Sequence, residues 1–153
     1  MKIRYTKQYN TDTCGPIALI NILKWSGQKV SVRKNLKSIS SLCGCEKGEG
    51  TLPSMFMASL ILLDFGYKKI KNRLPDFDKV LDDGQIILVD QEEDANNEDG
   101  HYYLVVGKTK KTFKCVNLYI GKSISIVNRK AMFNLIRNTK KQSSKCYAIR
   151  RLK

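Results

Sequence analysis

The 153-residue chain lacks the features of an exported, membrane-spanning or disulfide-held protein. Its N-terminus, Met-Lys-Ile-Arg-Tyr-Thr-Lys, has no apolar core of signal-peptide length, and its longest apolar run, around Leu60–Leu63, is far shorter than a membrane span. Five cysteines, an odd number without a secretory signal, indicate free thiols rather than a disulfide framework. We therefore expect a cytoplasmic protein without a membrane span, and the oligomeric state stays open.

Acidic residues are also scarce, with 14 against 28 lysines and arginines, a formal charge of +14. This balance raises nucleic acid as a partner, but the basic residues are scattered and no nucleic-acid module accompanies them. We expect no specific nucleic-acid binding and a solvated, lysine-rich surface. Ten of the 14 acids lie between Asp76 and Asp99. We interpret Asp90–Asp99 as a solvated loop; the alternative is a segment at one end of a cleft that favours basic substrate residues.

Histidine is reduced to a single residue, His101, which opens the apolar, β-rich run His101-Tyr-Tyr-Leu-Val-Val-Gly107. Any chemistry that needs an imidazole base must use it. Sixteen residues later, Asn117 ends the strand-like Thr112–Val116. A strand pair would bring His101 and Asn117 together, so Asn117 is the candidate to orient the imidazole through its second ring nitrogen. Asp99 is an alternative orienter.

Cys14 stands between a polar turn and an apolar, helix-period run, in Gln8-Tyr-Asn-Thr-Asp-Thr-Cys14-Gly-Pro-Ile. Thr11, Asp12 and Thr13 offer N-cap side chains, Pro16 suits a first helical turn, and the helix is expected to end near Trp25. A cysteine alone is most often a small buried residue. At a helix N-terminus, however, the thiolate is favoured, and Gln8 is placed to donate an N–H to an oxyanion beside the sulfur.

Together these motifs resemble the papain-like cysteine peptidases. The match is closest to the bacterial family that trims double-glycine leader peptides from bacteriocins. It rests on Gln-x5-Cys-Gly-Pro, then Gly-His-Tyr-Tyr-Leu-Val-Val-Gly, then Val-Asn-Leu-Tyr, and it runs from about Lys7 to about Ile136. One departure is that the family usually has Asp-Pro where this chain has Asn117-Leu118.

The resemblance implies an oxyanion donor at Gln8, a nucleophile at Cys14, a base at His101 and its orienter at Asn117. It implies a peptide or protein substrate and hydrolysis of a peptide or amide bond through a thioester. Two alternatives stay open: acyl or amide transfer, including transpeptidation, on the same residues, and a catalytically weak relative that binds peptides.

The order of periodic segments predicts one α+β domain over residues 1–153, without internal repeat or linker. The expected plan is a papain-like fold of two lobes, with an N-terminal helical lobe carrying the nucleophile and a C-terminal antiparallel sheet carrying the base. We expect no metal at Cys43-x-Cys45, because no second ligand pair accompanies it. The acids do not follow a calcium-loop pattern, and no cofactor is expected.

The segments expected to form helices and strands divide the chain as follows. Helices are predicted at 14–25, 32–42, 51–64, 75–81 and 129–137, with Ser31, Thr51 and Asn128 as N-caps, Gly66 closing the third helix, and Phe133 and Ile136 inward. Strands are predicted at 68–73, 85–89, 101–107, 112–116, 124–127 and 146–149.

Overall fold

The computed structural model describes residues 2–9, 14–44, 53–94 and 97–152. Within them, six strands form one sheet in the order β1-β6-β2-β3-β4-β5, and all neighbouring strands are antiparallel. The predicted α+β class is confirmed. The strands are β1 (Phe65–Ile70), β2 (Ile86–Asp94), β3 (Asn97–Lys108), β4 (Thr112–Tyr119), β5 (Lys122–Asn128) and β6 (Ser143–Arg151).

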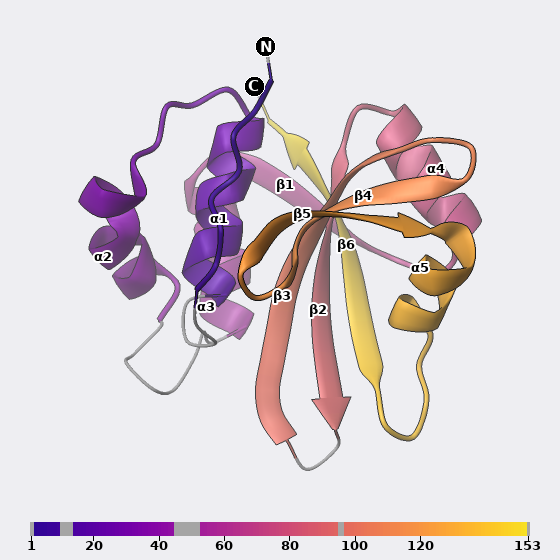
Figure 1. Cartoon of the computed structure of the whole chain (residues 1–153). Helices are drawn as coiled ribbons and strands as arrows, with labels where there is room; N and C mark the ends of the chain where they lie inside the picture. Colours follow the sequence, from indigo (N-terminus) through magenta and orange to yellow (C-terminus); the bar gives the residue numbers. More distant parts are fainter. Residues whose placement is uncertain (1, 10–13, 45–52, 95–96, 153) are drawn as a thin grey trace.

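Five helices among the described residues cover the two faces of this sheet. Figure 1 shows α1, α2 and α3 on one side and α4 and α5 on the other. The helices are α1 (Cys14–Trp25), α2 (Val32–Leu42), α3 (Pro53–Leu62), α4 (Leu74–Asp82) and α5 (Arg129–Ile136). Their positions agree with the five predicted helices to within a few residues at each end.

Two hydrophobic cores lie on the two faces of the sheet, because successive strand residues point to opposite sides. In β2, Ile86 and Leu88 belong to the core under α1, α2 and α3, whereas Ile87 and Val89 belong to the core under α4 and α5. Burial on both faces explains why β2 begins as an uninterrupted apolar run rather than an alternating one. The same alternation separates Tyr102 from Tyr103 in β3.

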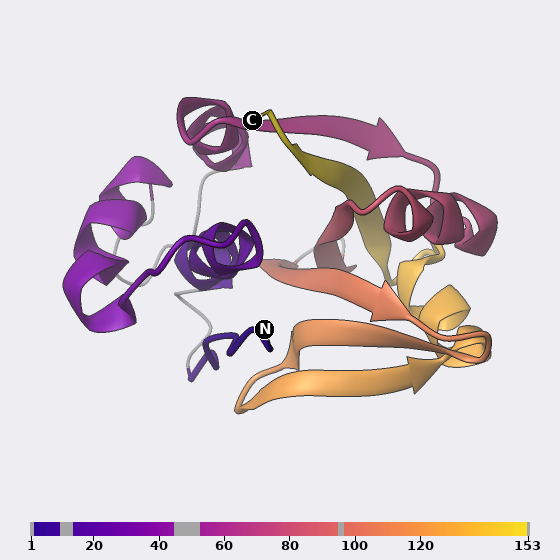
Figure 2. The ribbon, with the colours of Figure 1, turned by 90° about the horizontal axis from the view of Figure 1, so that it is seen from above.

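An N-terminal arm, residues 2–9, precedes α1 without forming a helix or strand of its own. Figures 1 and 2 show the arm between α1 and the turn that joins β4 to β5. Hydrogen bonds hold it there, to Asn21 of α1 on one side and to Asn117 of β4 on the other. The arm therefore connects the helical layer to the sheet.

Three expectations drawn from the sequence are wrong. Gly66 does not close α3: Asp64, with φ of 67°, takes the left-handed position, and Gly66 lies inside β1. A Cβ at Gly66 would lie 2.7 Å from the Arg150 Nε, so any larger residue there would require the Arg150 side chain to move. Phe133 is 46% exposed, whereas Met132 is the residue buried beside Ile136.

The acidic segment Asp90–Asp99 is the third correction, since its described residues form strands rather than a loop. Residues 90–94 continue β2 and 97–99 begin β3. The predicted caps Thr11, Asp12, Thr13 and Thr51, and the second thiol of the Cys43-x-Cys45 pair, lie outside the described residues.

Candidate active site

Cys14 opens α1, as predicted from the sequence. The helix that follows is almost entirely apolar and buried, with Leu19, Ile20 and Ile22 fully inaccessible. It packs against β3, the strand that carries His101. The nucleophile candidate and the base candidate therefore lie on two elements in direct contact.

His101 is partly buried and is held by a short contact to a carbonyl oxygen. Its Nε2 lies 2.7 Å from the backbone oxygen of Asn117. A carbonyl oxygen can only accept, so this geometry requires a hydrogen on Nε2 and leaves Nδ1 as the acceptor of the neutral ring. The imidazole also lies against the buried Tyr103, with ring centroids 6.1 Å apart. The surroundings thus select the tautomer in which Nδ1 is the acceptor.

Asn117 contacts His101 through its backbone, while its side chain points to the N-terminal arm. The residue has φ of 56°, a left-handed conformation that asparagine tolerates better than most residues, and it is 3% exposed. Its Oδ1 accepts from the Gln8 backbone N–H at 3.1 Å, and its Nδ2 donates to the Thr6 carbonyl at 2.7 Å. One residue therefore joins the base to the arm.

Gln8 is 1% exposed and its backbone is fixed on both sides. Besides the N–H bonded to Asn117, its carbonyl accepts from the Gly121 N–H at 2.8 Å, in the turn between β4 and β5. The structure thus brings Gln8, Asn117 and His101 into one hydrogen-bonded group. Of Cys14 it describes the backbone, which begins the adjoining helix.

Sequence reasoning missed two residues of this group, Thr6 and Asn21. Asn21 is fully buried on α1 and bonds to the backbone of Thr6. The signal was present, because a polar amide between Ile20 and Ile22 interrupts an apolar helix and needs a partner. The sequence did not show that the partner is the backbone of Thr6, because the arm has no periodic pattern that predicts its position.

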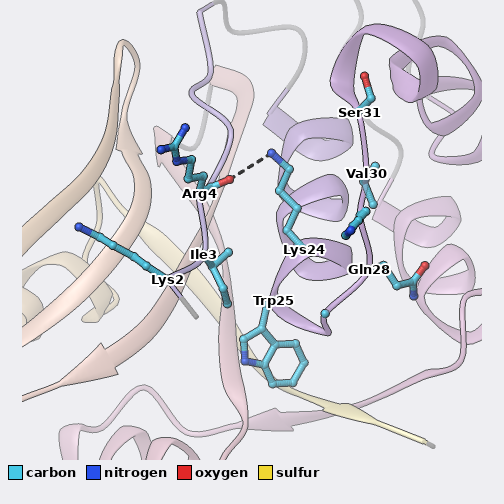
Figure 3. Close-up of a pocket in the computed structure, with 10 residues that line it drawn as sticks. Lys2, Ile3, Arg4, Lys24, Trp25, Gln28, Val30 and Ser31 are labelled. Carbon is cyan, nitrogen blue, oxygen red and sulfur yellow. Dashed lines mark hydrogen bonds between the residues drawn. The ribbon is translucent and has the colours of Figure 1, made fainter.

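A groove of about 710 Å³ lies at the opposite end of α1 and is not part of this site. Figure 3 shows the residues that line it, which come from the arm, from the end of α1 and from residues 27–31, and the bond from Lys24 to the Arg4 carbonyl. A 12-residue helix is about 18 Å long, so this groove and Cys14 are separated by nearly that length.

The other described thiols differ from a reactive cysteine. Cys43, Cys115 and Cys146 are buried. Burial raises the pKa of both Cys115 and Cys146 to about 12, so these two stay protonated near neutral pH. Within the described residues, no group of three potential ligands is placed to hold a metal ion. Nor does any helix there have the length and apolar character needed to cross a bilayer.

Comparison with solved structures confirms the resemblance at the level of the fold. The peptidase domain of Streptococcus ComA, a bi-functional ABC transporter involved in quorum sensing, superposes with a TM-score of 0.67 at 16% identity, covering 95% of this chain and 98% of that one. A double glycine motif protease from an AMS/PCAT transporter, solved with its leader peptide, gives 0.66 at 13% identity, covering 98% and 92%. By sequence, the chain matches no family profile and no curated protein.

Proposed function

We propose that this chain is a cysteine peptidase-like hydrolase that cleaves a peptide or amide bond through Cys14, His101, Asn117 and Gln8. The observation that carries the proposal is the hydrogen-bonded group around Asn117. It fixes the His101 tautomer through a carbonyl and holds the Gln8 backbone through an amide. The proposal includes a two-lobe arrangement with the cleft between helices and sheet, a peptide or protein substrate, and a cytoplasmic setting.

The proposed reaction begins with proton transfer from the Cys14 thiol to Nδ1 of His101. The sulfur then forms a bond to the substrate carbonyl carbon, and the carbonyl oxygen becomes an oxyanion held by the Gln8 side-chain N–H and the Cys14 backbone N–H. The C–N bond breaks as the imidazolium gives its proton to the leaving amine. Water attacks the thioester, His101 takes its proton, and the C–S bond breaks to release the acid and the thiolate.

Two features of the chain support this assignment of roles. The N-terminus of α1 favours an anionic sulfur at Cys14, because unpaired N–H groups and the helix dipole stabilise negative charge there. The fold is shared with peptidase domains, of which one was solved with a leader peptide. A peptide containing a double glycine is therefore the first substrate to try.

The test of the proposal is the rate of Cys14 alkylation by iodoacetamide between pH 4 and 9, resolved by site with mass spectrometry. We expect Cys14 to label well below the pKa of ~8.5 of a free thiol, and to lose this reactivity in His101→Ala. Cys115 and Cys146 serve as internal controls, since burial raises the pKa of each to about 12. A Cys14 that labels only at alkaline pH, with or without His101, contradicts the proposal.

Turnover is then measured on peptides with Gly-Gly before the scissile bond, with Cys14→Ala as the blank. Release of a free carboxylic acid supports hydrolysis. Capture of the acyl group by an added amine, in preference to water, shows acyl transfer instead. Fast alkylation without turnover on any peptide favours a binding relative.

A further inference from the structure

Asn21 is a fully buried amide in the middle of the apolar helix α1. A buried amide costs free energy unless its polar atoms find partners. Both partners here belong to the backbone of one residue: Oδ1 accepts from the Thr6 N–H at 2.7 Å, and Nδ2 donates to the Thr6 carbonyl at 3.1 Å. Asn21 therefore pairs with the arm much as a neighbouring strand would.

A second buried amide, that of Asn117, binds the same point of the arm from the sheet. The Thr6 carbonyl also accepts from Asn117 Nδ2 at 2.7 Å, and Asn117 Oδ1 takes the N–H of Gln8. Lys24, nearly one turn after Asn21, adds bonds to the Thr6 hydroxyl at 2.7 Å and to the Arg4 carbonyl at 3.1 Å, the latter drawn in Figure 3. Since the arm has no helix or strand, these bonds determine its path.

We infer that Asn21 is a positioning residue that places Gln8 relative to Cys14. The inference rests on the proposed function, in which Gln8 holds the oxyanion. Cys14 and Asn21 lie on one helix, seven residues and thus about two turns apart, so their backbone positions lie on nearly the same side of the helix axis. Thr6 is two residues from Gln8. Asn21 ties the arm to the helix of the nucleophile, whereas Asn117 ties it to the strand beside the base.

Two reagents separate oxyanion stabilisation from thiolate reactivity. Acylation of Cys14 by p-nitrophenyl acetate forms a C–S bond through a tetrahedral oxyanion and then breaks the C–O bond to release p-nitrophenolate. Iodoacetamide is attacked at a saturated carbon, so a C–S bond forms as iodide leaves and no oxyanion arises. The ratio of the two rate constants at Cys14, after subtraction of the Cys14→Ala background, reports the oxyanion donors.

The variants are Asn21→Leu, which removes both bonds to Thr6, and Asn21→Asp, which keeps the shape and the acceptor but loses the Nδ2 donor. Gln8→Ala is the positive control. Ser59→Ala is the matched control, because Ser59 is 1% exposed in the same helical layer and its hydroxyl bonds to carbonyls outside the arm.

We expect Asn21→Leu and Gln8→Ala each to lower the acylation rate about tenfold or more, since a small displacement of a catalytic group has large effects. Alkylation should change by less than about twofold, and Ser59→Ala should leave the ratio unchanged. A merely structural role for Asn21 would lower both rates together.

Each other outcome is decisive. If Gln8→Ala lowers the ratio and folded Asn21 variants do not, the positioning role is wrong while the proposed function stands. If the wild-type protein reacts slowly with both reagents, the proposed function itself fails. If circular dichroism shows that Asn21→Leu does not fold, the ratio measured on Asn21→Asp decides the question by the same criteria.

Discussion

The bonds made by the Asn117 side chain lead to a quantitative prediction for Asn117→Ala. The substitution removes the acceptor of the Gln8 N–H, which costs about 1–3 kcal/mol for a buried donor. It also removes the donor to the Thr6 carbonyl, costing only about 0.5–1.5 kcal/mol because Asn21 still donates to that oxygen. Alanine in a left-handed conformation adds about 1–2 kcal/mol. The free energy of unfolding should therefore fall by about 2.5–6.5 kcal/mol.

Asn117→Gly separates the backbone part of this loss from the hydrogen bonds. Glycine adopts φ of 56° without steric cost but makes neither side-chain bond. It should be more stable than Asn117→Ala by about 1 kcal/mol and still less stable than the wild-type protein. The carbonyl that contacts His101 remains in both variants, so the pH profile of Cys14 alkylation should persist while peptide hydrolysis falls.

Asn117→Asp introduces the residue that is usual at this position in the family that the sequence resembles. The structure predicts that this substitution destabilises the protein. The carboxylate keeps an acceptor for Gln8 but opposes the Thr6 carbonyl, which needs a donor. The folded state then favours the protonated carboxyl, so the pKa of the new group is raised. The contribution of this carboxyl to the stability of the fold is fully present below the unfolded pKa of ~3.9 and is lost as pH rises through the folded pKa.

The assay for all three variants is urea denaturation followed by far-UV circular dichroism, at pH 4 and pH 7. The reasoning is refuted if Asn117→Ala and Asn117→Gly lie within about 0.5 kcal/mol of the wild-type protein, the usual range for uninvolved surface positions. It is equally refuted if Asn117→Asp matches the wild-type protein at pH 7.

Three further predictions concern stability away from the site. Burial, with a contribution from Glu92, raises the pKa of Asp90 to about 6. Ionisation of Asp90 should therefore make the folded protein less stable as pH rises from about 4 to 6. Asp90→Asn should remove this pH dependence and stabilise the protein at pH 7 by up to about 3 kcal/mol. Arg129 lowers the pKa of Asp78 through a bidentate ion pair between α5 and α4. The pair stabilises the fold above the unfolded pKa of ~3.9 and is lost as pH falls through the lower folded pKa. Arg129→Lys should therefore cost about 1 kcal/mol in thermal unfolding at pH 7 and progressively less as pH falls below ~3.9. In urea denaturation, Met132→Ala should lower the free energy of unfolding by about 2–4 kcal/mol and Phe133→Ala by less than about 1 kcal/mol, because only Met132 of the two is fully buried. Equal losses would instead support the inward orientation of Phe133 expected from periodicity.

Local signals predicted the helices well, because each depends on contacts close in sequence. Asn128 caps α5 as expected, with Oδ1 accepting from the Ala131 N–H at 2.7 Å. The apolar run that begins β2 was likewise visible as a buried strand. Phe133 was misplaced because α5 is short, and a rotation of one residue changes which aromatic or aliphatic side chain faces the core.

The acidic segment was misjudged because strand pairing is a long-range property. Asp90–Glu92 looked like a loop by composition, yet they pair with Lys145–Ser143 of β6 as well as with β3. Backbone hydrogen bonds to both neighbours outweigh the weak β propensity of acidic residues. The interior position of β6, between β1 and β2, was equally absent from the local pattern.

For the candidate site, the sequence by itself determined the residue types and their order. It places Gln8 before a cysteine at the start of a helix, and Asn117 after the single histidine at a strand. These follow from periodicity and motif spacing, which are local. Tertiary structure alone decided how the parts are joined. The left-handed turn at Asn117 presents a carbonyl, not an amide, to His101, and the amides of Asn117 and Asn21 meet at Thr6. Those contacts join residues 15 to 111 positions apart, and a buried polar atom reveals its partner only when the chain is folded around it.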